Sequence, residues 1–523
     1  MSIPREFSSS KESPEAYKGF KLTKSFSIEA AIVVLLLIVF LVINIAISSR
    51  LFPVWQDEVL LTDPAANLYL GNGFTSSAWY YQTKDEFWAC NAPLHAILLY
   101  HWMRLFGFSL VAVRSLSYAF MAVSVLIIWL AVLRLNLVTS IWSRIILIAL
   151  LLLGEGVTFN YLSGRYDCLG ISLFAAALLA YSIQSIWLRC VLLVCIGIFV
   201  PIAGIHLVPY AAILGGLLLI YLGRSFLREA ASVAIGSTIG IIFLYILYAA
   251  NGVADVFFVK SLGGHTFYGA VNRSEAPIKG SEVEKVIYVL THFPIILVNR
   301  LANLPHWFFQ DTSLLLLLIL ALVIAIYQIS QANFNRHSLL SFGLVASFST
   351  ILGLGILRDY PNYYTWMSYI PLAICTCSSI DEFRKTNRSA LTRLLTLVSL
   401  VLICLPGYPL TLLSGIHNWS GRDYSGVESF IKTNIRDTDK VYSDFGSYYA
   451  IKKIAKSVVF PSYMDAITPQ EKADLSVIIL DKYQKYYRLT FEEVVNKLGG
   501  EWYDTGHSFN SPLYSLRIFR KKM

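Results

Sequence analysis

Charged residues are scarce in this chain, and metal-binding patterns are absent from its sequence. Only 14% of the 523 residues are Asp, Glu, Lys or Arg, 56% are hydrophobic, and the mean hydropathy is +0.60. Because soluble domains carry about 25% charged residues, this balance excludes a soluble globular enzyme. The seven cysteines form no CxxC pair and have no His-rich partner segment, which argues against structural zinc and against a disulfide framework.

Long apolar runs occupy most of the sequence up to residue 412. The run from Ile28 to Ser48 is long enough to span a bilayer, and because no cleavage site follows it, we expect an uncleaved first helix. Ten further spans are predicted at 110–133, 145–160, 167–187, 190–204, 208–222, 229–250, 312–330, 338–357, 364–381 and 391–412.

The distribution of Lys and Arg predicts the orientation of the chain. The formal net charge of +9 need not indicate nucleic acid, because multi-spanning proteins collect these residues in cytoplasmic loops. With the N-terminus inside, the inner segments hold 15 Lys and Arg in 70 residues, and the outer segments hold 9 in 142. We therefore expect a multi-pass protein of the plasma (inner) membrane with a cytoplasmic N-terminus, lipid contacts and no nucleic-acid partner.

Three parts are predicted along the chain. Residues 1–27 form a cytoplasmic segment, 28–413 a transmembrane domain with large outer loops at 51–109 and 251–311, and 414–523 an extracytoplasmic domain. In that last part, predicted helices at 425–434, 445–455 and 489–498 alternate with short apolar runs, as in a compact α/β unit. The predicted fold class is an α-helical polytopic membrane protein with about 11 transmembrane helices and a small C-terminal extracytoplasmic α/β domain.

Two adjacent carboxylates open the first outer loop. Asp57 and Glu58 follow Trp55 within a few residues of the first span. Carboxylates close to the bilayer are costly unless they are paired or used in function. Two interpretations are open: Asp57 caps a helix that begins near Val59, or the pair carries chemistry.

The same loop continues with aromatic residues and a short apolar segment. Trp79-Tyr80-Tyr81 and Phe87-Trp88 precede Pro93-Leu94. The segment 94–106 is too short to cross the bilayer, so it predicts an amphipathic helix that lies in the membrane interface.

The order and spacing of these features resemble those of the GT-C superfamily of multi-spanning glycosyltransferases. The nearest branch contains the protein O-mannosyltransferases and the lipid A aminoarabinose transferases. The stretch that carries the resemblance comprises Asp57-Glu58, Ala92-Pro93-Leu94, Trp102, Phe106-Gly107 and Ala112-Val113-Arg114. Gly164-Arg165-Tyr166-Asp167 is similar to the family's second acidic site, and 358–373 is similar to its basic and aromatic entry to a late span.

The resemblance implies an inverting transfer of a hexosyl or pentosyl group from a polyprenyl-phosphate donor to a lipid, glycan or protein acceptor at the outer face. Such a transfer needs a carboxylate that takes the proton of the acceptor hydroxyl and cations that stabilise the departing phosphate. Asp57 is the expected base, Glu58 positions the acceptor or a cation, and Asp167 is the second carboxylate. The alternative for Asp167 is a cap on the fourth span.

Other charged or aromatic residues are expected to bind the substrates. They are Lys84, His95, Arg104, Arg114, Arg165, Lys260, His265, Arg358 and Tyr364. The family's usual Lys and second Pro before the interfacial helix are replaced here by Asn91-Ala92-Pro93, which puts the usual phosphate contact in question. Arg114 is expected to pair with a loop carboxylate. A divalent cation is a possible cofactor, although the sequence has no compact set of ligands for one.

Two other functions fit a multi-spanning, aromatic-rich chain. A lipid-linked sugar flippase or transporter should place ionisable residues at mid-membrane and show two related halves, whereas the charged candidates here cluster at outer helix ends. An O-antigen ligase or polymerase uses a different donor linkage, and the early Asp57-Glu58 pair argues against it.

Overall fold

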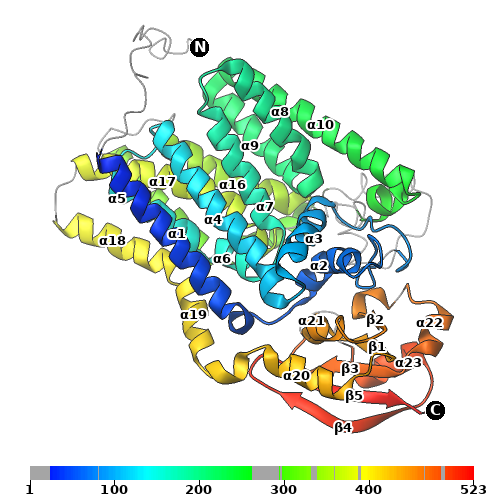
Figure 1. Cartoon of the computed structure of the whole chain (residues 1–523). Coiled ribbons are helices and arrows are strands. Elements are labelled where there is room, and N and C mark those ends of the chain that lie inside the picture. The colour runs from blue at the N-terminus through cyan, green and yellow to red at the C-terminus, as the bar shows by residue number, and fades with distance from the viewer. Residues whose placement is uncertain are drawn as a thin grey trace.

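The structure is a computed structural model that describes residues 24–522, apart from 81, 262–293, 295–296, 331–337, 358–359, 387–389, 465 and 485–488. Of residues 24–25, 383–386 and 390–393 only the backbone is described. The chain has two parts, a large assembly of helices and a smaller C-terminal domain that contains a sheet (Figure 1).

The helices of the larger part coincide with all eleven predicted spans. They are α1 (Lys24–Leu51), α4 (Leu110–Arg134), α5 (Ile141–Leu153), α6 (Glu155–Leu162), α7 (Asp167–Tyr181), α8 (Ile186–Ala203), α9 (Leu207–Leu222), α10 (Leu227–Ala250), α15 (Thr312–Ser330), α16 (Leu339–Leu357), α17 (Trp366–Thr386), α18 (Ala390–Cys404) and α19 (Tyr408–Ile416). Short helical turns join or precede them: η3 (Gly223–Phe226), η4 (Val256–Ser261), α14 (Leu304–Phe309), η5 (Asn362–Tyr364) and η6 (Trp419–Arg422).

Fewer of these helices are long and apolar enough to cross a membrane by themselves. Among the described residues six helical segments pass that test, one of them the continuous stretch Leu207–Ala250. The number rises to eight if the bent pairs α5/α6 and α18/α19, with bends of 52° and 56°, each count as one span. The helix α7, with 15 residues, is shorter than a span normally requires.

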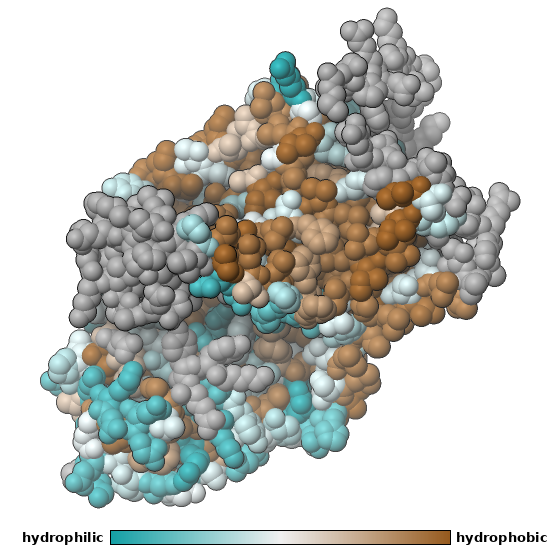
Figure 2. All heavy atoms as spheres, turned by 180° about the vertical axis from the view of Figure 1, so that it is seen from behind, coloured by the Kyte–Doolittle hydropathy of each residue, from teal (hydrophilic) through white to brown (hydrophobic). Residues whose placement is uncertain are grey.

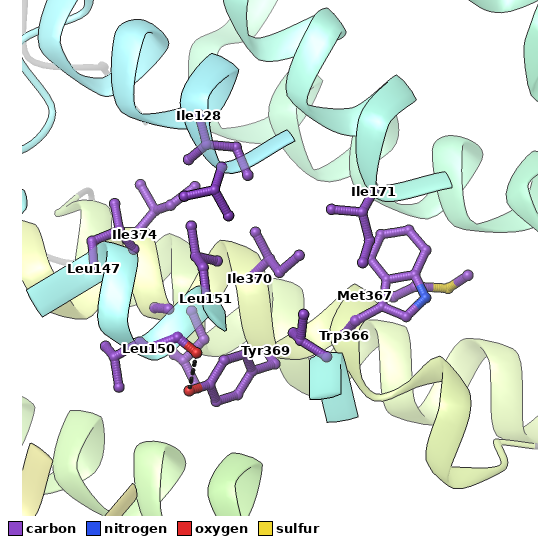
Figure 3. Packing of buried hydrophobic residues seen from close by; sticks show 14 of the residues in the cluster. Ile128, Leu147, Leu150, Leu151, Ile171, Trp366, Met367, Tyr369, Ile370 and Ile374 are labelled. Atoms are coloured by element: carbon purple, nitrogen blue, oxygen red, sulfur yellow. Dashed lines mark hydrogen bonds between the residues drawn. The ribbon is translucent and has the colours of Figure 1, made fainter. Parts of the chain in front are cut away.

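Apolar packing inside the helical part fixes the helices against one another. Ile128 of α4, Leu150 of α5, Ile171 of α7 and Tyr369 of α17 lie together in its core (Figure 3). The Tyr369 hydroxyl donates a hydrogen bond to the Leu150 carbonyl at 3.2 Å, so this buried polar group is satisfied. Figure 2 shows apolar side chains across the outside of the same helices as well, as expected of a surface that faces lipid.

The first outer loop contains two helices, α2 (Gln56–Tyr69) and α3 (Leu94–Phe106). The predicted helix over 94–106 is therefore confirmed with its bounds, and its position in the membrane interface stays a prediction. The interpretation of Asp57 as a helix cap is wrong, because α2 already begins at Gln56 and its N-cap position is Trp55.

The C-terminal domain is built on a five-stranded mixed sheet in the order β2-β1-β3-β5-β4. The strands are β1 (Lys440–Ser443), β2 (Ser457–Val459), β3 (Val477–Asp481), β4 (Trp502–Asn510) and β5 (Ser515–Lys521). The first three are parallel, with Val441 level with Val458 and Val477, whereas β5 runs antiparallel to β3 and β4. The helical segments are α20 (Ser425–Asn434), η7 (Phe445–Ser447), α21 (Tyr448–Ile451), η8 (Pro461–Tyr463), α22 (Pro469–Asp474) and α23 (Phe491–Leu498).

Two buried ion pairs lie where this domain meets the first outer loop. Arg114 donates to both carboxylate oxygens of Glu58, at 2.8 and 2.7 Å, and Tyr449 of α21 donates to the same carboxylate at 3.1 Å. In the second pair, Lys452 Nζ lies 2.8 Å from Oδ1 of Asp63 on α2. Both carboxylates are fully buried. The short helix α21 is thus held against α2 by charged hydrogen bonds in a low-dielectric interface.

We predict that Glu58→Gln lowers the thermal unfolding midpoint of the purified protein in detergent. The change leaves the fully buried Arg114 without its counter-ion, and removing one partner of a buried pair costs about 3–5 kcal/mol. The matched control is Glu428→Gln, which removes an exposed partner of Lys453 and should cost no more than about 1 kcal/mol. Equal midpoints for the two variants would contradict this account of Glu58.

Candidate active site

A cavity of about 1480 Å³ lies between the helical part and the C-terminal domain. Its helical wall comes from the start of α2, the connection between α6 and α7, and the segments around α14 and η5. Its opposite wall comes from loops of the C-terminal domain. A large cavity with convergent polar groups between two structural units is the usual setting of a ligand site.

Arg165 lies between two carboxylates at the helical wall of this cavity. Its Nη1 contacts Asp57 Oδ2, and its Nε donates to Asp167 Oδ2 at 2.8 Å. The Asp57 side chain is 26% exposed, whereas those of Arg165 and Asp167 are 3% and 0% exposed. Asp57 is therefore the carboxylate of this group that reaches the cavity.

Several contacts fix the orientation of the Arg165 guanidinium. It lies 3.6 Å from the centre of the Tyr363 ring, close enough for a cation–π interaction. Gly164, at φ +64°, turns the chain just before it, and a Cβ there would come within 3.2 Å of Glu58. Trp55 donates its indole N–H to the Ser163 carbonyl at 3.1 Å and so joins α2 to the same turn.

Behind Asp167 lies a group of rings. His206 Nε2 is 3.7 Å from Asp167 Oδ1, and its ring stacks on Tyr364 with centroids 4.8 Å apart. The Tyr166 hydroxyl is 3.3 Å from His206 Nδ1. Asp167 occupies the first turn of α7 without capping it, because the N-cap position is Tyr166. The interpretation of Asp167 as a cap is therefore wrong, and its described partners are Arg165 and His206.

The structure brings some of the sequence candidates to the cavity and gives others different partners. Asp57, Arg165 and Tyr364 line it. Two candidates, His265 and Arg358, lie outside the described residues. The remaining described candidates, Glu58, Lys84, His95, Arg104, Arg114, Asp167 and Lys260, do not line the described cavity.

These off-cavity positions correct the expected roles of several residues. Glu58 and Arg114 form the buried pair described above, as expected for Arg114 but not for Glu58. Lys84 pairs with Glu471 at 2.8 Å, and Lys260 lies 3.6 Å from Asp255. Arg104 is exposed on α3, the usual position of a long cationic side chain on an interfacial helix.

His95 is fully enclosed on α3, which removes it as a phosphate-binding cation. Burial lowers its pKa to about 4, and the positive charge of Arg165 acts in the same direction. At neutral pH the imidazole is therefore uncharged.

Sequence reasoning missed several polar residues on the helical wall. Arg300, Asn303, His306 and Gln310 line the cavity from the segment that leads into α15. Their spacing of three or four residues places them on one face of a helix. That spacing is visible in the sequence, and it could have singled out Arg300 as a candidate among the basic residues of the second outer loop.

No group of three or more His, Cys, Asp or Glu side chains in the described part of the chain is placed to hold a metal ion. Asp57 and Asp167 are instead joined by a guanidinium, which supplies positive charge between them. The possible divalent cation stays a prediction from the resemblance.

The chain shares its fold with solved structures of ArnT, and the predicted class, a helical multi-pass membrane protein with a small C-terminal α/β domain, is confirmed. The apo-state crystal structure of ArnT from Cupriavidus metallidurans aligns with a TM-score of 0.57 at 12% identity, covering 94% of this chain and 98% of that chain. The structure of ArnT bound to undecaprenyl phosphate gives 0.52 at 11% identity, covering 93% and 97%.

A third structure, an oligosaccharyltransferase from Archaeoglobus fulgidus, aligns with a TM-score of 0.46 at 13% identity over 85% of this chain and 69% of that chain, too low to carry an argument. A scan against protein-family models finds no match, and neither does a search of curated proteins. At these identities the likeness to ArnT establishes the fold alone. The reaction that the protein catalyses depends on the residues of its own site.

Sequence reasoning also did not single out Asp311, whose carboxyl group lies next to the cavity. Asp311 follows the cavity-lining Gln310, is fully buried, and accepts the Leu314 N–H at 2.9 Å at the start of α15. Burial raises its pKa to about 6, and the nearby Glu155 adds to the shift. In an unfolded chain an aspartate keeps a pKa of about 4.

We predict that Asp311→Asn raises the thermal unfolding midpoint at pH 8 more than at pH 4. The folded state binds the Asp311 proton more tightly than the unfolded state does. The contribution of Asp311 to the free energy of unfolding is therefore fully present below pH about 4, and it is lost as the pH rises through about 6. Asparagine keeps the helix cap without a charge. A midpoint difference between the variant and the unmodified protein that does not change with pH would contradict the raised pKa.

Proposed function

We propose that this protein is an inverting glycosyltransferase that uses a polyprenyl-phosphate sugar as donor and acts at the outer face of the membrane. The observation that carries this proposal is the Asp57–Arg165–Asp167 group at a cavity between an apolar helical part and a polar domain. An amphiphilic donor needs such a boundary, with an apolar surface for its chain and polar groups for its head. The fold shared with ArnT supports the same class of reaction.

The proposed reaction follows from the position of Asp57. Its carboxylate takes the proton of the acceptor hydroxyl, whose oxygen then forms a bond to the anomeric carbon of the donor sugar. The bond between that carbon and the phosphate oxygen breaks, and the electron pair leaves with the polyprenyl phosphate. Because attack and departure occur on opposite faces, the anomeric configuration is inverted.

Arg165 and Asp167 have different roles in this scheme. Arg165 stabilises the negative charge that develops on the departing phosphate and holds the Asp57 carboxylate in place. Asp167 is fully buried and bonded to Arg165, so we assign it as a positioning residue that fixes the guanidinium. The buried bond means that Arg165 need not reorganise during the reaction.

A second arginine lines the helical wall of the cavity. Arg300 lies on the segment before α15, and arginine is well suited to bidentate contact with phosphate. The structure of ArnT with undecaprenyl phosphate supports a lipid phosphate as the ligand class in this fold. We therefore propose that Arg300 binds the donor phosphate together with Arg165.

Asp57→Asn is expected to lower sugar transfer by about 10²- to 10⁴-fold, the usual contribution of a general base. The test is mass spectrometry of lipids, glycans and proteins from cells that lack the gene and express each variant. Membrane levels of the variant should be normal, because the carboxylate is partly exposed. Asp255→Asn, at a 62% exposed carboxylate outside the cavity lining, is the control and should keep normal product. Near-normal product from Asp57→Asn would remove this residue from the mechanism.

Arg300→Ala is expected to weaken binding of undecaprenyl phosphate by roughly tenfold, which corresponds to about 1.4 kcal/mol for one lost charged contact. Binding is measured by titration of the purified protein in detergent at two salt concentrations, and the variant should also show a smaller salt dependence. Arg517→Ala, which removes a 61% exposed arginine of β5, is the matched control. Unchanged affinity for Arg300→Ala would exclude a phosphate contact by Arg300.

A further inference from the structure

One edge of the C-terminal sheet faces the cavity. The three parallel strands β1, β2 and β3 end at the same edge, and the residues that follow each of them line the cavity. They are Phe445 and Gly446 after β1, Pro461 and Ser462 after β2, and Tyr483 and Gln484 after β3. Asp481, the last residue of β3, lines it as well.

The strand order creates a crevice at this edge. In the order β2-β1-β3-β5-β4, the connection from β1 leads to β2 on one side, and the connection from β3 leads to β4 on the other side. The carboxyl ends of β1 and β3 therefore form a topological switch point. In open α/β sheets ligands bind in the crevice outside the strand ends at such a point.

The backbone at the switch point packs closely and fixes the side chains there. Gly446 lies so close to β3 that a Cβ on it would come within 2.3 Å of Asp481 Oδ2. Asp481 Oδ1 accepts the N–H groups of Tyr483 at 2.9 Å and Ser515 at 3.0 Å, and Gln484 Oε1 accepts the Phe445 N–H at 2.9 Å. These bonds fix the carboxylate and the amide side chain at the cavity wall.

The chemistry of this wall suits a sugar. Carboxylate and amide groups pair with hydroxyls as acceptors and donors. Tyr483 is 50% exposed and offers a ring on which the apolar face of a sugar can pack, with a hydroxyl at its tip. The edge combines the polar groups of Asp481 and Gln484 with the apolar side chains of Phe445 and Pro461, and a sugar presents surfaces of both kinds.

We propose that the crevice between β1 and β3 binds a saccharide portion of the acceptor, so that the substrate is a glycan or glycolipid. This inference rests on the proposed function, because it assigns the wall opposite Asp57 and Arg165 to the acceptor. The donor is held from the helical part and the acceptor sugar from the C-terminal domain. The acceptor hydroxyl then meets the anomeric carbon inside the cavity.

The test compares Tyr483→Ala and Gln484→Ala with two matched controls in the full-length protein. The controls are Tyr503→Ala, at a 45% exposed tyrosine of β4, and Gln470→Ala on α22, both in the same domain but outside the cavity lining. Each variant is expressed in cells lacking the gene, and the product is measured and identified by mass spectrometry. Affinity for undecaprenyl phosphate is measured on the purified proteins.

The two crevice variants should lower product by about tenfold or more, as expected for the loss of roughly 1.4 kcal/mol of binding, with unchanged affinity for undecaprenyl phosphate. The controls should keep normal product. Normal product from both crevice variants, or a product in which the sugar is attached directly to a protein side chain or to a lipid without sugar, would overturn the proposal. Absence of both product and undecaprenyl phosphate binding in the unmodified protein would instead overturn the proposed function, and this inference with it.

Discussion

The position of one guanidinium sets the geometry of the candidate site. Two carboxylates close to a low-dielectric helical part repel each other and lose solvation, and a cation placed between them offsets both costs. Arg165 provides that cation, and it is buried, bonded to Asp167 and packed over Tyr363. Because the cation cannot turn away, Asp57 is directed toward the cavity while remaining in contact with it.

The adjacent acids of the first outer loop serve two different purposes because they lie on a helix. Successive helical residues point about 100° apart, so Asp57 faces the cavity while Glu58 faces the interior and pairs with Arg114. The bond from Tyr449 to Glu58 then couples the C-terminal domain to the same turn of α2. The adjacent residues Asp57 and Glu58 therefore connect the helical wall of the cavity to the contact that holds the C-terminal domain in place.

Much of the fold could be predicted from local patterns. Apolar runs located the membrane helices, and amphipathic spacing gave α3 and α20 with their bounds. The resemblance singled out Asp57 and Arg165, although their contact joins positions 108 residues apart. It could not rank the basic residues, because their roles depend on packing between distant segments: Lys84 meets Glu471 across nearly 400 positions, and His95 loses its charge through burial. The opposing wall formed by the C-terminal sheet likewise depends on tertiary docking.

The proposed reaction between a lipid-linked donor and a polar acceptor places demands on the architecture as a whole. The donor's chain is stable only against an apolar surface, whereas a hydroxyl-rich acceptor is stable only beside polar groups or water. A site inside the helical part would exclude the acceptor, and a site on the polar domain alone would leave the donor's chain in water. The cavity at the interface satisfies both requirements, with Arg165 on the helical side and the ends of three parallel strands on the other. The buried pairs at Glu58 and Asp63 hold the C-terminal domain against α2 and so set the position of one wall relative to the other.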